Sequence, residues 1–318
     1  IRDRDYRGNA KYKIAFLGEY DALPELGHGC GHNLIAMMSL GAAVAFSQSA
    51  PQDWGTTFFG CPAEETIGGK VYMAEAGLFK DYEAALIIHP GGENEVGGTS
   101  LATHPLEVTF HGRSCHIASL TDSGINALDC AVELYQKIKE LKKTFPKGAI
   151  VGAIFTEAGT APNVVTPKAT IRMTVRGSTV DDLEGIILPA IKAAAQEIAA
   201  SYGAQVEMHH YEPLFKDMRQ DKKLLNLFKA VMTEFGEVPR ILPDDEADGS
   251  TDVGNVSYEV PTAQPSLQIG GGLEAHTPEF TCAAGSDYGL AQAIKGAKIM
   301  AVVALRYPLP RHYLSFDI

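Results

Sequence analysis

The chain has 318 residues, of which 45% are hydrophobic, and this length favours two domains with separate cores. Lysine and arginine number 27 against 39 aspartates and glutamates, so the net charge is −12. A charge of this sign repels the phosphates of nucleic acid and of anionic lipid, so we expect neither nucleic acid nor a membrane as a partner. The longest nearly apolar run, residues 34–46, is also shorter than the roughly 20 residues of a membrane-spanning helix.

The cysteines are odd in number and form no CxxC pair, so they indicate neither a disulfide framework nor a structural zinc site. They are Cys30, Cys61, Cys115, Cys130 and Cys282. A reducing compartment fits this pattern, and we expect a cytoplasmic protein. The chain opens at Ile1 without a methionine and soon enters a strand-like run, so we expect that an N-terminal portion is missing and leave a targeting signal open.

The first hundred residues alternate strand-like and helical patterns. Short apolar runs at 14–17, 56–60 and 84–88 are separated by helical patterns at 33–46 and 68–76, the first of which Asn33 is placed to cap. This alternation predicts a mainly parallel sheet flanked by helices, whose ligands bind beyond the carboxyl ends of the strands. Polar residues follow the three runs at those ends, namely Glu19 with Asp21, Glu64 with Glu65, and His89.

The pattern changes near residue 105. The next segment reads as a β-α-β-β-α-β series, which can build its own small sheet-and-helix layer. Its strands are predicted at 106–110, 149–155, 169–175 and 205–210, and its helices at 125–141 and 180–201. A helix at 222–235, a strand at 266–269 and a helix at 287–305 then resume the first pattern. We therefore predict a domain of residues 105–212 inserted into a domain made of residues 1–104 and 213–318.

The segment Gly27-His28-Gly29-Cys30-Gly31-His32-Asn33 packs two histidines and a cysteine between glycines, just before a predicted helix. Glycines let the backbone turn tightly and approach a ligand closely, and imidazole and thiolate are preferred donors for zinc and similar ions. We interpret the segment as a metal-binding loop.

Three other strand ends carry metal-donor or acid–base side chains. Glu64 and Glu65 follow the run 56–60, so one carboxylate can bind a metal while the other acts as a general base. His89 follows the run 84–88, and His276 lies in a glycine-rich loop after the predicted strand 266–269. Each feature alone has an ordinary structural explanation, but four such strand ends together favour a metal site.

This combination resembles the aminoacylase and carboxypeptidase family of dinuclear metallohydrolases. It is most similar to the amidohydrolase branch, which includes p-aminobenzoyl-glutamate hydrolase, the plant indole-acetyl-amino-acid hydrolases and a β-alanyl-lysine dipeptidase. The matching motifs occur in the order Glu19-Tyr20-Asp21-Ala22-Leu23-Pro24, GHGCGHN, PAEE, His89, GRSCH, PNVVTP, STDVGN and AHTPEF. They span nearly the whole chain.

The resemblance implies two divalent metal ions, zinc or manganese, with Cys30 bridging them. The remaining ligands would be His32, Glu65, His89 and His276. Glu64 would be the general base, and Asp21 would orient a ligand from behind the site.

The resemblance also implies that the inserted domain is a lid through which the protein forms a homodimer. His116 matches a lid histidine that stabilises the oxyanion of the tetrahedral intermediate, often across the dimer. Asn163 and Arg176 match substrate-binding residues, and the planar guanidinium of Arg176 suits a substrate carboxylate.

We therefore expect a metal-dependent hydrolase of amide bonds in N-acyl amino acids or dipeptides, with p-aminobenzoyl-glutamate or a β-alanyl dipeptide as possible substrate types. Two alternatives remain. The chain could be a metal-binding scaffold or sensor that keeps the site without turnover, or a thiol hydrolase with Cys30 as nucleophile paired with His32 or His28. A dinucleotide-binding function is not indicated, because no GxGxxG follows a predicted strand.

Overall fold

The computed structural model describes residues 10–118 and 124–307. The chain divides into two compact units, one formed by Ile1–Thr99 with Met218–Ile318 and the other by Ser100–Asp217. The sequence analysis placed the two joins after residues 104 and 212. The opening residues, from which we expected a missing N-terminal portion, lie outside the described residues.

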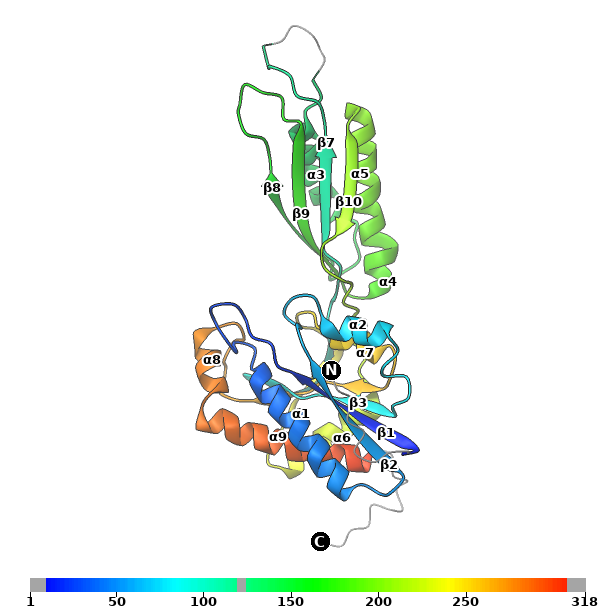
Figure 1. Cartoon of the computed structure of the whole chain (residues 1–318), viewed down its shortest axis with the longest axis vertical. Helices are drawn as coiled ribbons and strands as arrows, with labels where there is room; N and C mark the ends of the chain where they lie inside the picture. The colour runs from blue at the N-terminus through cyan, green and yellow to red at the C-terminus, as the bar shows by residue number, and fades with distance from the viewer. Residues whose placement is uncertain (1–9, 119–123, 308–318) are drawn as a thin grey trace. The chain divides into compact units, whose positions relative to one another are not determined.

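The main sheet of the first unit has the strand order β12-β3-β1-β2. Its strands are β1 (Tyr12–Glu19), β2 (Trp54–Cys61), β3 (Ala84–Leu86) and β12 (Thr262–Ala263), and all pairs are parallel. Helices α1 (His32–Ser49), α6 (Lys222–Glu234) and α9 (Asp287–Arg306) lie on one side, and α2 (Gly69–Glu75) and α7 (Val253–Ser257) on the other (Figure 1). The predicted parallel sheet flanked by helices is confirmed.

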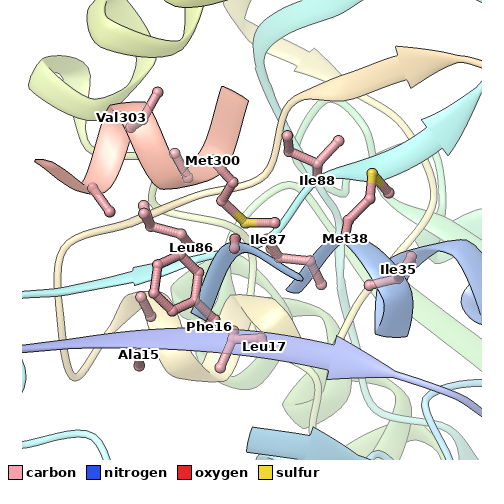
Figure 2. Close-up of a cluster of buried hydrophobic side chains, with 14 of the residues drawn as sticks. Ala15, Phe16, Leu17, Ile35, Met38, Leu86, Ile87, Ile88, Met300 and Val303 are labelled. Carbon is pink, nitrogen blue, oxygen red and sulfur yellow. The ribbon is translucent and has the colours of Figure 1, made fainter. Parts of the chain in front are cut away.

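Burial of apolar side chains holds these layers together. Figure 2 shows Phe16 of β1 on the side of the strand where Met38 of α1 and Met300 and Val303 of α9 lie, and all four are at most 1% exposed. Each fully buried side chain of this size contributes about 1.5 to 3 kcal/mol relative to an exposed one. The packing fixes the ends of the strands, from which the candidate site is built.

A second sheet of the first unit was not predicted. Its order is β11-β5-β13-β4, with β4 (His89–Gly91), β5 (Glu95–Thr99), β11 (Arg240–Ala247) and β13 (Ser266–Gln268). We expected His89 to end the run 84–88, and this was wrong. Strand β3 ends at Leu86, and His89 begins β4, where it pairs with Ser266 of β13 instead.

The second unit has an antiparallel sheet of order β10-β7-β9-β6, with β8 also paired to β9. Its strands are β6 (Ala102–Thr103), β7 (Leu106–His111), β8 (Ile150–Glu157), β9 (Lys168–Gly177) and β10 (Gln205–His210). Helices α3 (Ala127–Leu141) and α5 (Leu188–Tyr202) cover one face (Figure 1). The elements follow one another in the predicted β-α-β-β-α-β order.

The predicted helix 180–201 is interrupted at its start. A short α4 (Val180–Asp182) leads into a π-helical turn η1 (Leu183–Ile187), and the amide of Leu188 donates to the carbonyl of Leu183, five residues back. Pro189 follows directly in the first turn of α5 and has no amide hydrogen for the regular helical ladder. The wider π-helical turn therefore accommodates the hydrogen bond that Pro189 cannot donate.

Among the described residues, one helix is long and apolar enough to cross a membrane, namely α9. Half of that stretch is buried inside the structure, where it packs against α1. The same length and composition occur in core helices, so this feature alone is weak support for a membrane span.

Candidate metal centre

The first unit brings the five predicted ligands and Glu64 together. Their donor atoms form three overlapping groups, within each of which all atoms lie within 4.8 Å of one another. The groups are Cys30 with His32 and His89, Cys30 with Glu65 and His276, and His32 with Glu64 and Glu65. Cys30, His32 and Glu65 each belong to two groups, so the three groups form one continuous cluster.

Gly31 sets the direction in which the metal-binding loop enters α1. It has a left-handed φ of 73°, and a Cβ built on it would lie 2.5 Å from Pro90 Cγ, so a larger residue does not fit. His32 is the first helical residue. We expected Asn33 to cap this helix, but its side chain instead donates to the carbonyl of Ala284 over 3.0 Å, and the cap position is Gly31.

Two non-glycine residues with positive φ shape the loops that carry other donors. Ala63 has a φ of 61° just after β2 and precedes the two glutamates, and His276 has a φ of 64°. The amide of His276 donates to the carbonyl of Gly29 over 2.9 Å, which ties its loop to the metal-binding loop. Such backbone conformations cost about 1 to 3 kcal/mol and persist where the surrounding structure enforces them.

Hydrogen bonds fix which ring nitrogen of two histidines faces the cluster. His89 Nδ1 lies 2.7 Å from the carbonyl oxygen of Pro90 and donates to it, which leaves Nε2 facing Cys30 Sγ at 3.9 Å. His32 Nδ1 lies 3.1 Å from Asp21 Oδ1, which leaves its Nε2 facing Glu64 and Glu65. A second partner on the outer nitrogen is typical of histidines that bind metal.

Asp21 connects two donor-bearing segments. Its Oδ2 accepts a hydrogen bond from the backbone amide of Glu65 over 3.1 Å, while Oδ1 contacts His32. Burial disfavours its charged form, but these hydrogen bonds outweigh burial and lower the pKa of Asp21 to about 2. Asp21 therefore holds its negative charge behind the cluster.

The other donors form close contacts with one another. His276 Nε2 lies 3.4 Å from Cys30 Sγ and 3.5 Å from Glu65 Oε1. The His276 side chain is 56% exposed and that of His32 only 1%, so the cluster is deep at one end and open to solvent at the other. A substrate can therefore reach it from the His276 side.

The chemistry of the donor set fits divalent metal ions. His32 Nε2 and Glu65 Oε1 are buried and have no hydrogen-bond partner in the structure. Buried polar atoms are almost always satisfied, so such atoms at the centre of a donor cluster favour a missing ligand. Thiolate, imidazole and carboxylate together suit zinc and related ions.

Electrostatics also favour a cation. Burial, followed by the nearby charge of Glu19, raises the pKa of Glu64 to about 8. Burial and Glu65 raise the pKa of the Cys30 thiol. Burial opposes protonation of His32, but the Asp21 hydrogen bond and the charge of Glu19 raise its pKa to about 9. The protein without metal therefore carries protons where a metal ion would supply positive charge.

Sequence reasoning missed part of the surroundings. Lys70 is fully buried and lies 2.7 Å from Glu19 Oε1 and 2.6 Å from Asp252 Oδ1. Glu19 and Asp252 both lie in motifs noted in the sequence, but Lys70 has the appearance of an ordinary surface lysine in a helix. No sequence signal would have found it, because its burial depends on segments far away in the chain.

The remaining candidates lie in the second unit. His116 and Asn163 are exposed on neighbouring segments, where the amide of Ile117 donates to the carbonyl of Asn163 over 3.0 Å and His116 pairs with Val164. Arg176 lies near the end of β9 and pairs with Thr103. Because β9 runs from Lys168 to Gly177, its two ends are roughly 30 Å apart at about 3.3 Å per residue.

The segments that hold His116 and Asn163 adjoin the Lys168 end of β9, where Gly112 donates to the carbonyl of Pro167. Arg176 lies at the opposite end. The structure therefore brings His116 and Asn163 together and keeps both far from Arg176 within the second unit.

A parallel sheet with sulfur, nitrogen and oxygen donors at its strand ends, and a carboxylate of raised pKa beside them, is typical of metal-dependent hydrolases. Comparison with known proteins gives the family. The sequence pattern of Peptidase family M20/M25/M40 matches residues 15–306, and the chain belongs to this family. Membership confirms the predicted resemblance and the predicted class, a metal-dependent hydrolase of amide bonds.

Two curated relatives illustrate the likeness. The Xaa-Arg dipeptidase of Mus musculus is 32% identical over 306 residues, which are 94% of this chain and 70% of that protein. A p-aminobenzoyl-glutamate hydrolase component from Escherichia coli is 33% identical over 201 residues, 56% of this chain and 42% of that protein.

Solved structures share the fold. A dinuclear metal-binding peptidase of the M20 family from Bacillus subtilis has a TM-score of 0.67 at 21% identity, covering 94% of this chain and 83% of that one. The aminobenzoyl-glutamate utilization protein of Klebsiella pneumoniae has a TM-score of 0.69 at 21% identity, covering 96% and 73%. The predicted α/β fold with a parallel sheet flanked by helices is thereby confirmed.

Proposed function

We propose that the chain hydrolyses the amide bond of N-acyl amino acids or dipeptides with two divalent metal ions, zinc or manganese, and releases a free amino acid. The observation that carries this proposal is the convergence of five donor side chains, Cys30 among them, with Glu64 beside them. The relatives support the substrate class, because one is named a dipeptidase and another a p-aminobenzoyl-glutamate hydrolase.

The five donors divide naturally between two ions. Cys30 would be the ligand that the two ions share, with His32 and His89 on one side. Glu65 and His276 are its partners on the other side. Glu65 also lies 4.0 Å from His32 Nε2, so the two halves of the cluster are in contact.

Bound metal ions would polarise the scissile carbonyl and lower the pKa of the attacking water. Glu64 accepts the proton of that water and then passes it to the leaving amine, a role that its carboxylate can take beside the candidate ligand His32. Asp21 holds the His32 ring in the tautomer that points Nε2 at the cluster.

The second unit contributes the remaining groups. His116 stabilises the oxyanion, and Asn163 of one copy with Arg176 of the other holds the carboxylate of the released amino acid. The two ends of β9 are roughly 30 Å apart, and one small substrate cannot contact both. This separation supports the view that residues at the two ends of β9 serve different active sites. We therefore propose that His116 and Asn163 act on the site of a second copy, in a homodimer formed through the second unit.

The exposed edge of the second unit supports such a dimer. Strand β8 pairs only with β9 among the described strands, and its apolar Ile150, Ile154 and Phe155 are 47%, 64% and 38% exposed. An open strand edge with apolar side chains is a template for pairing with another chain. A second copy that pairs along β8 would cover it.

We also propose a cytoplasmic location without membrane attachment. All five cysteines are free, and a hydrolase that depends on the Cys30 thiolate is best protected in a reducing compartment. Fractionation of cells that produce the full-length protein tests this location.

A substrate panel tests the function. The metal-free protein is reconstituted with Zn²⁺ or Mn²⁺ and assayed against N-acyl amino acids, p-aminobenzoyl-glutamate and β-alanyl dipeptides. We expect turnover of at least one class and none in EDTA. Metal binding without turnover of any substrate would favour the scaffold or sensor, and turnover that survives EDTA would favour a Cys30 nucleophile.

A further inference from the structure

A fully buried lysine lies beside the candidate metal centre, between two carboxylates. Lys70 Nζ is 2.7 Å from Glu19 Oε1 and 2.6 Å from Asp252 Oδ1, and each of the three side chains is at most 1% exposed. The backbone amide of Lys70 also donates to Asp252 Oδ2 over 2.8 Å. We call Glu19, Lys70 and Asp252 the buried triad. None of them belongs to the proposed ligand set.

The buried triad joins three elements. Glu19 is the last residue of β1, Lys70 lies in the first turn of α2, and Asp252 directly precedes α7. Each buried ion would cost several kcal/mol if it were unpaired, so the three charges depend on one another. Two carboxylates and one ammonium leave a single negative charge uncompensated within the triad.

That negative charge faces His32. Glu19 Oε2 is 3.4 Å from His32 Nε2, closer than Glu64 Oε2 at 3.9 Å or Glu65 Oε1 at 4.0 Å. Lys70 holds the other oxygen of the same carboxylate. Asp21 holds the imidazole at Nδ1, and the Glu19 carboxylate lies next to Nε2, the atom that would bind metal.

We propose that the buried triad is a positioning device for His32 that raises the affinity of the cluster for a divalent cation. Lys70 fixes the orientation of the Glu19 carboxylate, and Glu19 limits the rotation of the imidazole. The uncompensated negative charge attracts a cation across a region of low dielectric constant. This inference rests on the proposed metal-dependent function, since it concerns the affinity of the same cluster.

Two isosteric substitutions test the triad. Glu19→Gln and Asp252→Asn each remove its net negative charge, but only Glu19 contacts His32. The metal-free proteins are titrated with Zn²⁺ in competition with a chromophoric chelator. We expect Glu19→Gln to lower the affinity for one of the two bound ions by about 10- to 100-fold. Asp252→Asn should lower the affinity for the same ion.

Glu237→Gln is the matched control. Glu237 is another buried carboxylate of the first unit that pairs with a lysine, Lys295, and its described hydrogen bonds and ion pair go to residues outside the donor cluster. We expect this substitution to lower the free energy of unfolding without changing Zn²⁺ affinity. The visible spectrum of the Co²⁺-loaded protein should change in Glu19→Gln but not in Glu237→Gln, because it reports ligand geometry rather than stability.

Folded Glu19→Gln that binds both ions with unchanged affinity would overturn the proposal. If Glu19→Gln does not fold, Asp252→Asn carries the same test, and equal affinity there would also overturn it. If Glu237→Gln lowered the Zn²⁺ affinity to the same extent, the effect of the triad would be one of protein stability, and the proposal would be overturned. A wild-type protein that binds no Zn²⁺ would instead contradict the proposed function itself.

Discussion

Glu64 and Glu65 are adjacent in the chain but have different surroundings. Glu65 Oε1 lies 3.5 Å from His276 Nε2, and its amide is held by Asp21. Glu64 Oε2 lies 3.9 Å from His32 Nε2. At the scale of single residues, this difference supports the proposed roles of metal binding for Glu65 and proton transfer for Glu64.

Replacing Glu64 tests that assignment. Glu64→Gln keeps the shape of the side chain but cannot accept a proton, so we expect kcat to fall by about 10²- to 10⁴-fold while both metal ions stay bound. Metal content by atomic emission and steady-state kinetics measure the two effects. Near-normal turnover would contradict the role of Glu64 as the base.

Gly31 gives a second prediction at this scale. We expect Gly31→Ala to destabilise the protein by more than the roughly 1 to 2 kcal/mol of left-handed strain, because its Cβ would also meet Pro90 Cγ at 2.5 Å. Gly236→Ala is the control, since Gly236 has a φ of 82° and no atom within 4 Å of a built Cβ. Urea unfolding of both variants measures the difference, and equal losses would argue against the close contact.

At the scale of elements, a buried polar network ties the end of α6 to α9. Glu237 follows α6 and contacts Gln292 and Lys295 of α9, and Asn94 donates to it from the segment before β5. Burial opposes the charged form of Glu237, but these partners outweigh burial and lower its pKa below 4.5. The network therefore contributes stability only while Glu237 is ionised.

This network predicts a pH dependence of stability. The folded-state pKa of Glu237 is lowered, so its contribution is complete above the ordinary value of 4.5 and is lost as the pH falls through the lower folded value. We expect Glu237→Gln to cost about 1 to 3 kcal/mol at neutral pH and less in acid. Urea unfolding at pH 7 and near pH 3 measures the loss, and a cost that stays constant with pH would contradict the assignment.

Most strands of the parallel sheet followed from apolar runs, and so did β13 of the second sheet, but β11 did not. Strand β11 is exposed along nearly its whole length and includes Pro243, Asp244 and Asp245, which have low strand propensity. It forms because Arg240 and its neighbours pair with β5. Strand propensity was outweighed here by pairing between segments far apart in the chain, which a local pattern does not contain.

At the scale of the whole molecule, the metal ions would couple function to stability. A ligand that binds only the folded state stabilises that state by about 2.7 kcal/mol when its free concentration is 100 times its dissociation constant. We therefore expect EDTA to lower the melting temperature and Zn²⁺ or Mn²⁺ to restore it. Differential scanning calorimetry measures the shift, and an unchanged melting temperature would argue against a metal in the folded state.

The proposed dimer gives a complementation test. Glu64→Gln and His116→Ala should each be inactive, but if His116 acts on a second copy, a mixed dimer has one site with both residues intact. We expect activity to return when the two variants are unfolded together and refolded. No recovery despite verified mixed dimers would place the function of His116 within its own chain.

The sequence by itself determined the class of fold and the family and pointed to the candidate donor residues, because period, turn chemistry and motif spacing are local properties of the chain. It did not determine that Lys70 lies buried between Glu19 and Asp252, that His89 begins a strand of a second sheet, or that Asn33 bonds to Ala284 rather than capping α1. These features depend on contacts between distant segments, and only tertiary packing decides which of them form.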